Sequence, residues 1–101
     1  MLDREFFLGF IKIHILYHAA KEDIFGVAIA KELARHGYSV SPGTLYPVLH
    51  RMEKAGYLES SSRVINGRVR KYYRATVAGK TALAEAKKRI KELVTEVIEG
   101  K

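Results

Sequence analysis

Cysteine is absent from the sequence, and so is glutamine. The lack of cysteine excludes disulfide bonds and zinc sites built on thiolates. No apolar run approaches the roughly 20 residues that a membrane-spanning helix requires. The N-terminal segment carries acids at Asp3 and Glu5 and has no small-residue cleavage motif, so we expect no signal peptide. Together these absences predict a cytoplasmic protein that does not enter a membrane.

The motifs of enzymes are also missing. The chain has no Ser/His/Asp spacing, no cysteine nucleophile and no glycine-rich loop that would cradle a phosphate. We therefore expect neither an enzyme nor a bound cofactor. The one spacing that resembles a metal site is that of His14, His18 and Glu22, four residues apart on a predicted helix. Since no HExxH motif or second ligand cluster accompanies them, we interpret them as polar edges of a buried helix and predict no metal.

The composition fits a small domain with its positive charge concentrated in one region. The chain has 101 residues, 48% of them hydrophobic, and dimerisation would extend the modest core that this size allows. Of the net charge of +7, most lies in residues 41–75, which hold seven Lys or Arg and two Glu. Such a concentration is typical of nucleic-acid binding, with a solvated basic surface as the alternative. A single asparagine beside many Lys, Arg and Glu is also typical of a thermophile.

A helix-turn-helix is predicted in the first half of the chain. Its first helix, residues 26–36, ends before Gly37, a favourable C-terminal glycine. The buried stripe expected on this helix is Val27, Ile29, Ala30, Leu33 and Ala34. Ser41 is a preferred N-cap, whose hydroxyl is expected to accept a backbone hydrogen bond, and Pro42 fits the first helical position. Residues 42–55 are therefore predicted to form a recognition helix.

The predicted recognition helix has two faces. Its buried stripe, at helical spacing, is Leu45, Val48, Leu49 and Met52. The opposite face is small, polar and basic, and its candidate DNA contacts are Ser41, Gly43, Thr44, Tyr46, Pro47, His50 and Arg51. Pro47 removes one helical hydrogen bond, and such a broken preference can mark a functional site. Tyr46 has a second interpretation, as a structural residue at the edge of the core.

A β-hairpin is predicted after this helix. Strands over residues 57–65 and 68–75 are joined by Asn66-Gly67, which favours a two-residue turn with positive φ. The turn places Arg63 opposite Arg70, a like-charge pair that a bound anion would stabilise. The candidate DNA contacts on this face are Arg63, Arg68 and Arg70. The other face is expected to be apolar at Leu58, Val64, Val69, Tyr73 and Ala75. We interpret the hairpin as a DNA-binding wing, with an edge-protected soluble ribbon as the alternative.

Both terminal helices are expected to contact a second copy of the chain. The helix predicted over residues 5–20 is apolar on nearly every side, and a single chain of this size has little with which to cover it. Thr76 caps a last helix that runs to about residue 99, roughly 35 Å at 1.5 Å per residue. An apolar residue recurs every seven positions along it. The predicted dimer interface comprises Phe6, Phe10, Leu83, Ala86, Ile90, Leu93 and Val97.

Four segments carry specific motifs: residues 25–33 (FGVAIAKEL), 41–49 (SPGTLYPVL), 53–58 (EKAGYL) and 67–76 (GRVRKYYRAT). In these motifs the chain resembles the PadR family of winged-helix transcriptional regulators, in its small form with a single C-terminal helix. The resemblance implies a homodimeric repressor on a palindromic operator, with the first and last helices at the dimer interface. It also adds Lys71 to the DNA contacts of the wing. The chain departs from the family at Val69, where proline is common.

The expected fold is mainly α with a β-hairpin wing. A winged helix-turn-helix DNA-binding domain is predicted over residues 1–75 and a C-terminal dimerisation helix over residues 76–101. The expected function is sequence-specific transcriptional regulation, with double-stranded DNA and a second copy of the chain as partners. Two alternatives stay open: an interaction module that binds no DNA, and a sensor with a small apolar or aromatic effector at the dimer interface. The residues expected to line such an effector site are Phe6, Phe10, Tyr17, Leu83 and Ile90.

Overall fold

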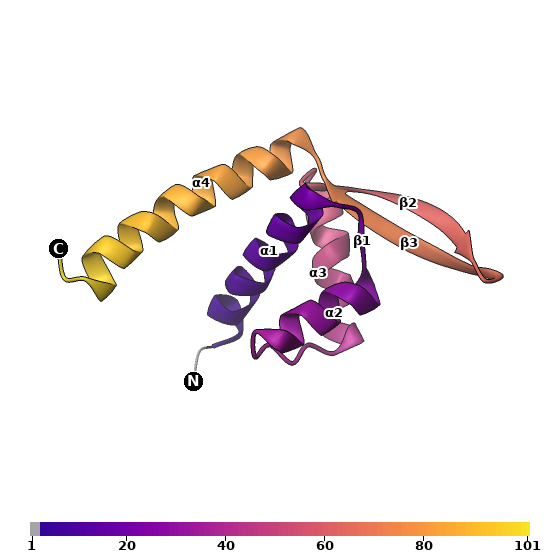
Figure 1. Ribbon diagram of the computed structural model, residues 1–101, viewed down its shortest axis with the longest axis horizontal. Helices are drawn as coiled ribbons and strands as arrows, with labels where there is room; N and C mark the ends of the chain where they lie inside the picture. The colour runs from indigo at the N-terminus through magenta and orange to yellow at the C-terminus, as the bar shows by residue number, and fades with distance from the viewer. Residues whose placement is uncertain (1–2) are drawn as a thin grey trace.

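The computed structural model describes residues 3–101. Along the chain the elements are α1 (Arg4–Lys21), β1 (Ile24–Phe25), α2 (Gly26–Arg35), α3 (Pro42–Lys54), β2 (Leu58–Ile65), β3 (Arg68–Ala75), α4 (Val77–Leu93) and the π-helix η1 (Val94–Ile98). Figure 1 shows α1, α2 and α3 gathered together, with the β2–β3 hairpin projecting on one side and α4 on the other. The longest dimension is 54 Å, against 30 and 20 Å in the other directions. The predicted mainly α fold with a hairpin wing and a long C-terminal helix is confirmed.

One apolar cluster joins the three central helices to the base of the hairpin. α1 begins after Asp3, whose carboxylate accepts a hydrogen bond from the Phe6 N–H at 3.0 Å. Complete burial of each large apolar side chain contributes about 1.5–3 kcal/mol. The buried residues are Ile11, Ile15, Leu16, Ala19, Ile24, Ile29, Leu33, Leu45, Val48, Leu49, Met52, Leu58, Tyr73, Ala75 and Leu83. The other side of α1 stays exposed at Phe6, Phe10 and Tyr17, in agreement with its all-round apolar sequence.

The turn between α2 and α3 has the predicted location but a different start for α3. Gly37 has a φ of +86°, and the Tyr38 N–H donates to the Leu33 carbonyl at 2.9 Å, which closes the end of α2. Ser41 precedes α3, but its side chain makes no capping hydrogen bond. The predicted side-chain cap is therefore wrong, because the Ser41 hydroxyl instead donates to the Thr44 hydroxyl at 3.3 Å.

The buried side of α2 is narrower than its sequence suggests. Ile29 and Leu33 are buried and Ala30 is half-buried, whereas Val27 and Ala34 are exposed. The prediction of a buried Val27 and Ala34 is therefore wrong. The side of α2 that faces the core consists of Gly26, Ile29, Ala30 and Leu33, and Val27 and Ala34 lie beyond its edges, where they face solvent.

The three strands form an antiparallel sheet in the order β1-β3-β2. Asn66 and Gly67 have φ values of +52° and +76°, as a two-residue turn with positive φ requires. The predicted register is confirmed, with Arg63 opposite Arg70. The two-residue strand β1 pairs with the other edge of β3, and the sequence pattern gives no sign of it.

Only the base of the hairpin reaches the core. Leu58, Tyr73 and Ala75 are buried, whereas Val64 and Val69 are 71% and 74% exposed. The expectation of an apolar face, which Ser60, Ser62 and Lys71 interrupt in the sequence, is therefore wrong for the two valines. They lie opposite each other near the turn, where the hairpin has extended past the rest of the molecule.

α4 starts in the core and then leaves it. The Thr76 hydroxyl caps the helix by accepting from the Gly79 N–H at 3.0 Å, as predicted. Leu83 is buried, but the exposed fraction reaches 39% at Ile90 and 70% at Val97. The last turn is a π-helix rather than the continuous α-helix expected. In the described part of the chain, no helix combines the length and the apolarity needed to cross a membrane.

Gly79→Ala is expected to destabilise the fold by about 1–3 kcal/mol, the usual cost of overpacking. Gly79 is buried, and a Cβ there would lie 2.1 Å from the Tyr57 carbonyl oxygen, a backbone atom that cannot rotate away. The same oxygen accepts from the Thr76 N–H at 3.1 Å. Gly43→Ala is the matched control, because its Cβ would meet nothing nearer than the Ser41 Oγ at 3.8 Å. Chemical denaturation measures both variants, and equal losses would contradict the prediction.

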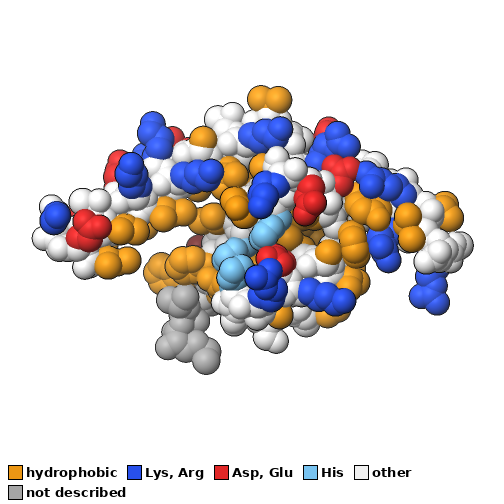
Figure 2. Space-filling model, in the orientation of Figure 1, with side chains coloured by type: hydrophobic (Ala, Val, Ile, Leu, Met, Phe, Trp, Pro, Cys, Tyr) orange, Lys and Arg blue, Asp and Glu red, His pale blue; other side chains and the backbone are white. Residues whose placement is uncertain are grey.

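Histidine side chains gather where α1 packs against the end of α2 (Figure 2). The rings of His14 and His36 stack with centroids 5.1 Å apart, and Tyr38 meets His14 edge-on at 5.2 Å. Burial lowers the pKa of His14 below its ordinary value of 6.5, and the neighbouring His36 and His18 lower it further. Within residues 3–101, no group of three or more potential ligands is placed to hold a metal ion.

Folding stability is expected to decrease as the pH falls below 6.5, the ordinary pKa of His14. Because the folded chain depresses this pKa, the unfolded state binds more protons in that range, so the stability from neutral His14 is complete above pH 6.5 and lost below it. Asp23 and Glu53, whose pKa values are also lowered, titrate at more acidic pH. His14→Phe should flatten the dependence, whereas His50→Phe, on the exposed side of α3, should not. Thermal unfolding between about pH 8 and about pH 5 tests this, and an unchanged profile for His14→Phe would refute it.

Candidate nucleic-acid interface

The solvent-facing side of α3 is the first part of the candidate interface. The predicted stripe of α3 is buried, so the remaining side chains of the helix turn away from the core. The exposed candidate contacts are Ser41, Gly43, Tyr46, Pro47, His50 and Arg51, and Thr44 is half-buried. Pro47 leaves the helix continuous from Pro42 to Lys54. α3 therefore presents a row of small, polar and basic side chains to solvent.

Tyr46 connects this face of α3 to α2. Its side chain is 47% exposed, and its ring covers Gly26, where a Cβ would lie 2.5 Å from the phenol oxygen. Gly26 therefore cannot carry a side chain unless Tyr46 moves. The position of Tyr46 agrees both with a DNA contact and with a structural residue at the edge of the core. Its ring packs on α2, and nearly half of its surface stays exposed to solvent.

The outer face of the hairpin is the second part of the candidate interface. The Arg63 guanidinium lies 4.0 Å from the centroid of the Tyr72 ring, and the Arg70 guanidinium lies 4.2 Å from that of Phe25. The two rings meet edge-on at 5.4 Å. A guanidinium that lies on an aromatic ring is held in place, and the N–H groups at its edge can bind an anion, which for Arg63 is already the Asp23 carboxylate. Arg68, beside the turn, is exposed as well.

Asp23 neutralises part of this basic face. Its carboxylate forms ion pairs with Arg63 and with Arg74, the latter at 3.2 Å. Desolvation raises the pKa of the Asp23 carboxyl, but the hydrogen bonds from Arg63 and Arg74 outweigh it and leave the pKa below its ordinary 3.8. A carboxylate of the chain itself therefore offsets the repulsion that the sequence predicted between Arg63 and Arg70.

Lys71 lies on the other face of the hairpin. Its ammonium forms an ion pair with Glu53 of α3 at 3.2 Å, and the Ser60 hydroxyl donates to the same carboxylate. The hydrogen bond from Ser60 is the main cause that lowers the pKa of Glu53, and the hydrogen bond to Glu53 raises the pKa of Lys71. Lys71 therefore already has a partner within the chain, and a DNA contact by this residue stays a prediction.

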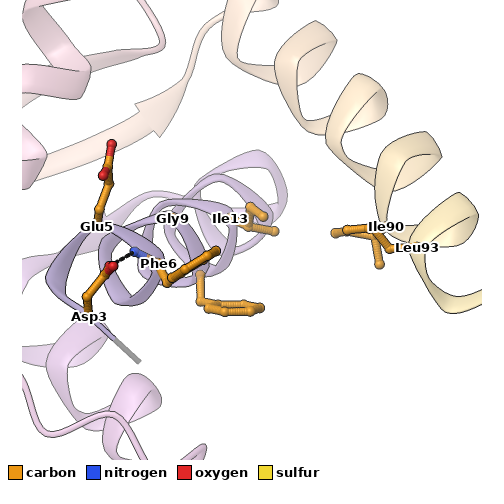
Figure 3. Close-up of a pocket in the computed structure, with 8 residues that line it drawn as sticks. Asp3, Glu5, Phe6, Gly9, Ile13, Ile90 and Leu93 are labelled. Atoms are coloured by element: carbon orange, nitrogen blue, oxygen red, sulfur yellow. Dashed lines mark hydrogen bonds between the residues drawn. The ribbon is translucent and has the colours of Figure 1, made fainter. Parts of the chain in front are cut away.

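An apolar groove separates the two terminal helices. It has a volume of about 450 Å³ and is lined by Phe6, Phe10 and Ile13 of α1 and by Ile90 and Leu93 of α4 (Figure 3). Figure 2 shows hydrophobic side chains along the side of α4 that faces α1, and Lys and Arg side chains on the opposite side. The two ends of the chain thus present apolar surfaces to the same open space.

The remaining residues of the predicted dimer interface differ in exposure. Leu83 is only 7% exposed and packs in the core of its own chain, so it leaves little surface for a partner. Ala86 is half-buried, and Val97 is 70% exposed. Tyr17 lines a separate hollow beside His14 rather than the groove.

Residues 15–85 match the family model described as the transcriptional regulator PadR-like family. The match extends from α1 to α4 and includes both parts of the candidate interface. The chain belongs to the PadR-like family of transcriptional regulators. It is 52% identical to the transcriptional regulator Rv3488 of Mycobacterium tuberculosis over 97 residues, which cover 96% of this chain and 91% of that relative.

Solved structures of PadR-like regulators have the same fold. The PadR family transcriptional regulator from Eggerthella lenta DSM 2243 is 33% identical, with a TM-score of 0.83 over 94% of this chain and 84% of that one. The PadR-like transcriptional regulator BC4206 from Bacillus cereus strain ATCC 14579 is 33% identical, with a TM-score of 0.81 over 90% of each chain. The resemblance drawn from the four motifs is confirmed, and membership of a regulator family excludes an enzyme. The family also implies DNA binding.

Three residues that shape the wing of this PadR-like regulator are not indicated by its sequence patterns: Asp23, Phe25 and Glu53. Tyr72, by contrast, is placed on the arginine face by the predicted register. Asp23 and Phe25 meet the hairpin only because β1 pairs with β3, and Asp23 is 40 and 51 positions from its two arginine partners. A two-residue strand has no periodicity from which such a pairing can be read.

Proposed function

We propose that this PadR-like regulator is a homodimeric repressor that binds a palindromic operator through α3 and the hairpin. The solvent-facing side of α3 carries the proposal. The only acid of α3, Glu53, is engaged by Ser60 and Lys71, so no free carboxylate on the helix would repel DNA. Such a helix fits the major groove, with residues near its N-terminus at the base edges. Residues 1–75 bind the DNA in this proposal, and residues 76–101 dimerise.

The start of α3 is suited to a phosphate group. A helix N-terminus carries partial positive charge and N–H groups that bind anions. The Ser41 side chain makes no capping hydrogen bond and so does not occupy the Gly43 N–H, whereas Pro42 has no N–H and the Thr44 N–H donates to the Ser41 carbonyl at 3.0 Å. The absence of a side chain at Gly43 permits close approach, and the hydroxyls of Thr44 and Tyr46 are then available to base edges. His50 and Arg51 lie further along, next to the backbone or a guanine edge.

The wing arginines are proposed to contact phosphate or the minor groove rather than to select bases. The stacking of Arg63 on Tyr72 and of Arg70 on Phe25 supports this role, because it orients both guanidiniums before DNA arrives. Arg68 would add its charge from the turn. Each phosphate that is neutralised contributes a slope of about 0.9 to the salt dependence of binding.

A second copy of the chain is proposed to cover the groove between α1 and α4. The groove leaves Phe6 at 63%, Phe10 at 45%, Ile90 at 39% and Leu93 at 58% exposure, and contiguous apolar surface of this kind is usually covered by a partner. A two-fold dimer would place two copies of α3 in successive major grooves, about 34–36 Å apart. The volume of the groove, about 450 Å³, also favours a second candidate, a sensor that takes up a small apolar or aromatic effector there.

The first test selects genomic DNA fragments with the wild-type protein and then compares Gly43→Ala on the enriched site. The fold of the variant should be unchanged or more stable by up to about 1 kcal/mol, since alanine favours a helix and the added Cβ meets nothing nearer than 3.8 Å. Its affinity for the site should nevertheless fall by about 1–3 kcal/mol, because the methyl group lies between the helix and the bases.

Fluorescence anisotropy and thermal unfolding measure these two effects on the same samples. A stable Gly43→Ala variant that binds the site with wild-type affinity would contradict the proposed contact between α3 and DNA. Failure of the wild-type protein to enrich any fragment would instead favour an interaction module that binds no DNA.

Ile90→Lys is expected to shift a dimer toward monomer and to lower its stability at the same time, since the partner supplies part of the core. Val77→Lys is the matched control, because Val77 is 84% exposed on the same helix but does not line the groove. Sedimentation at micromolar concentration measures the association. A wild-type protein that sediments as an 11.4 kDa monomer would contradict the proposed dimer.

A further inference from the structure

The hairpin has little apolar support along its length. Of the two eight-residue strands, only Leu58, Tyr73 and Ala75 are buried, and all three lie at the base. An isolated two-stranded hairpin is marginally stable in water. Beyond the pairing of β1 with β3 at Tyr72 and Tyr73, contacts on the two faces of the ribbon are therefore needed to fix the direction in which the end of the wing, residues 64–69, points.

A carboxylate from the segment between α1 and β1 holds the outer face. Asp23 forms ion pairs with Arg63 of β2 and with Arg74 of β3. It therefore joins both strands to the body of the molecule. Its side chain is 24% exposed, against 44% and 55% for the two arginines, so the carboxylate is more shielded from solvent than either partner.

A second carboxylate holds the inner face in the same manner. Glu53, in the last turn of α3, accepts a hydrogen bond from Ser60 of β2 and forms an ion pair with Lys71 of β3. The two acids thus contact opposite faces of the ribbon, and each contacts both strands. Glu53 also connects the wing directly to the helix that carries the candidate base contacts.

We propose that Asp23 and Glu53 are positioning residues that fix the direction of the wing relative to α3. This inference rests on the proposed DNA binding. The carboxylates hold the ribbon at the pairs from Glu59–Arg74 to Arg63–Arg70, so that Arg68 and Arg70 reach the DNA backbone while α3 occupies the groove. If the wing is rigid, the wing and α3 contact the DNA together without the loss of conformational entropy that ordering a mobile wing would cost.

Charge and position predict opposite effects when one of these acids is removed. Neutralising a carboxylate near DNA raises the local positive charge, so simple electrostatics predicts tighter binding to every sequence. Loss of positioning predicts weaker binding to the operator, with binding to random DNA unchanged or tighter. The sign of the change on the operator therefore separates the two effects.

The experiment compares Asp23→Asn with Glu22→Gln in the full-length protein. Glu22 is the adjacent acid, and in the part of the chain that the structure describes it forms no ion pair. The probes are the most enriched genomic fragment and a random duplex of equal length. Operator affinity of Asp23→Asn should fall by about tenfold, as when one well-placed contact is lost. That of Glu22→Gln should be equal to wild type or higher, and Glu53→Gln should behave as Asp23→Asn does.

Amide hydrogen exchange of the DNA-free protein provides a second measurement. Asp23→Asn should accelerate exchange in residues 61–64 and 69–72 and leave α3 unchanged, whereas Glu22→Gln should alter neither. The proposal is overturned if Asp23→Asn and Glu22→Gln bind both duplexes alike, or if exchange in the hairpin does not change. A wild-type protein that binds neither duplex would refute the proposed function instead, and the exchange result would still decide whether Asp23 holds the wing.

Discussion

The orientation of α3 depends on the apolar cluster that it shares with α1. Ile11 and Ile15 on one helix and Val48 and Leu49 on the other have no exposed surface at all. Successive residues of a helix are separated by about 100°, so burial of this stripe determines which residues can face solvent. The exposure of Gly43 and its neighbours on α3 is therefore a consequence of core packing rather than an independent property of the surface.

The wing combines positive charge with internal carboxylates. A hairpin with only arginines on one face would attract DNA strongly, but repulsion between Arg63 and Arg70 would also loosen it. Asp23 and the rings of Phe25 and Tyr72 offset that repulsion within the folded chain. The result is a weaker positive electrostatic field around the wing but better-defined positions of its arginines. Defined positions help the protein to bind an operator in one register, which charge alone does not do.

α4 connects the proposed dimer interface to the DNA-binding part. At its start, Thr76 and Gly79 are packed on the Tyr57 backbone at the base of the wing, and Leu83 is buried in the core. Further along, Ile90 lines the groove opposite α1. Because a helix is stiff over this distance, the angle between two copies of α4 would set the separation of the two DNA-binding surfaces. An effector in the groove would act on operator affinity through that angle.

The sequence by itself determined the elements whose signals are local. Asn66-Gly67 specifies a turn and hence the register, Gly37 ends a helix, and the stripe from Leu45 to Met52 specifies the inner face of α3, because each depends on residues a few positions apart. The tertiary structure alone decided the exposure of Val64 and Val69. An alternating strand pattern cannot show where the hairpin passes the edge of the core.

Long-range pairings were likewise decided only in three dimensions. The partners of Asp23 lie 40 and 51 positions away, and β1 is too short to have a pattern. Ser41 stands where an N-cap is expected, yet its hydroxyl donates to the Thr44 hydroxyl and accepts no backbone N–H. The rotamer of the Ser41 side chain decides between these two hydrogen bonds. Residue types thus specified the longer helices and strands, whereas packing specified the short strand β1 and which charges meet.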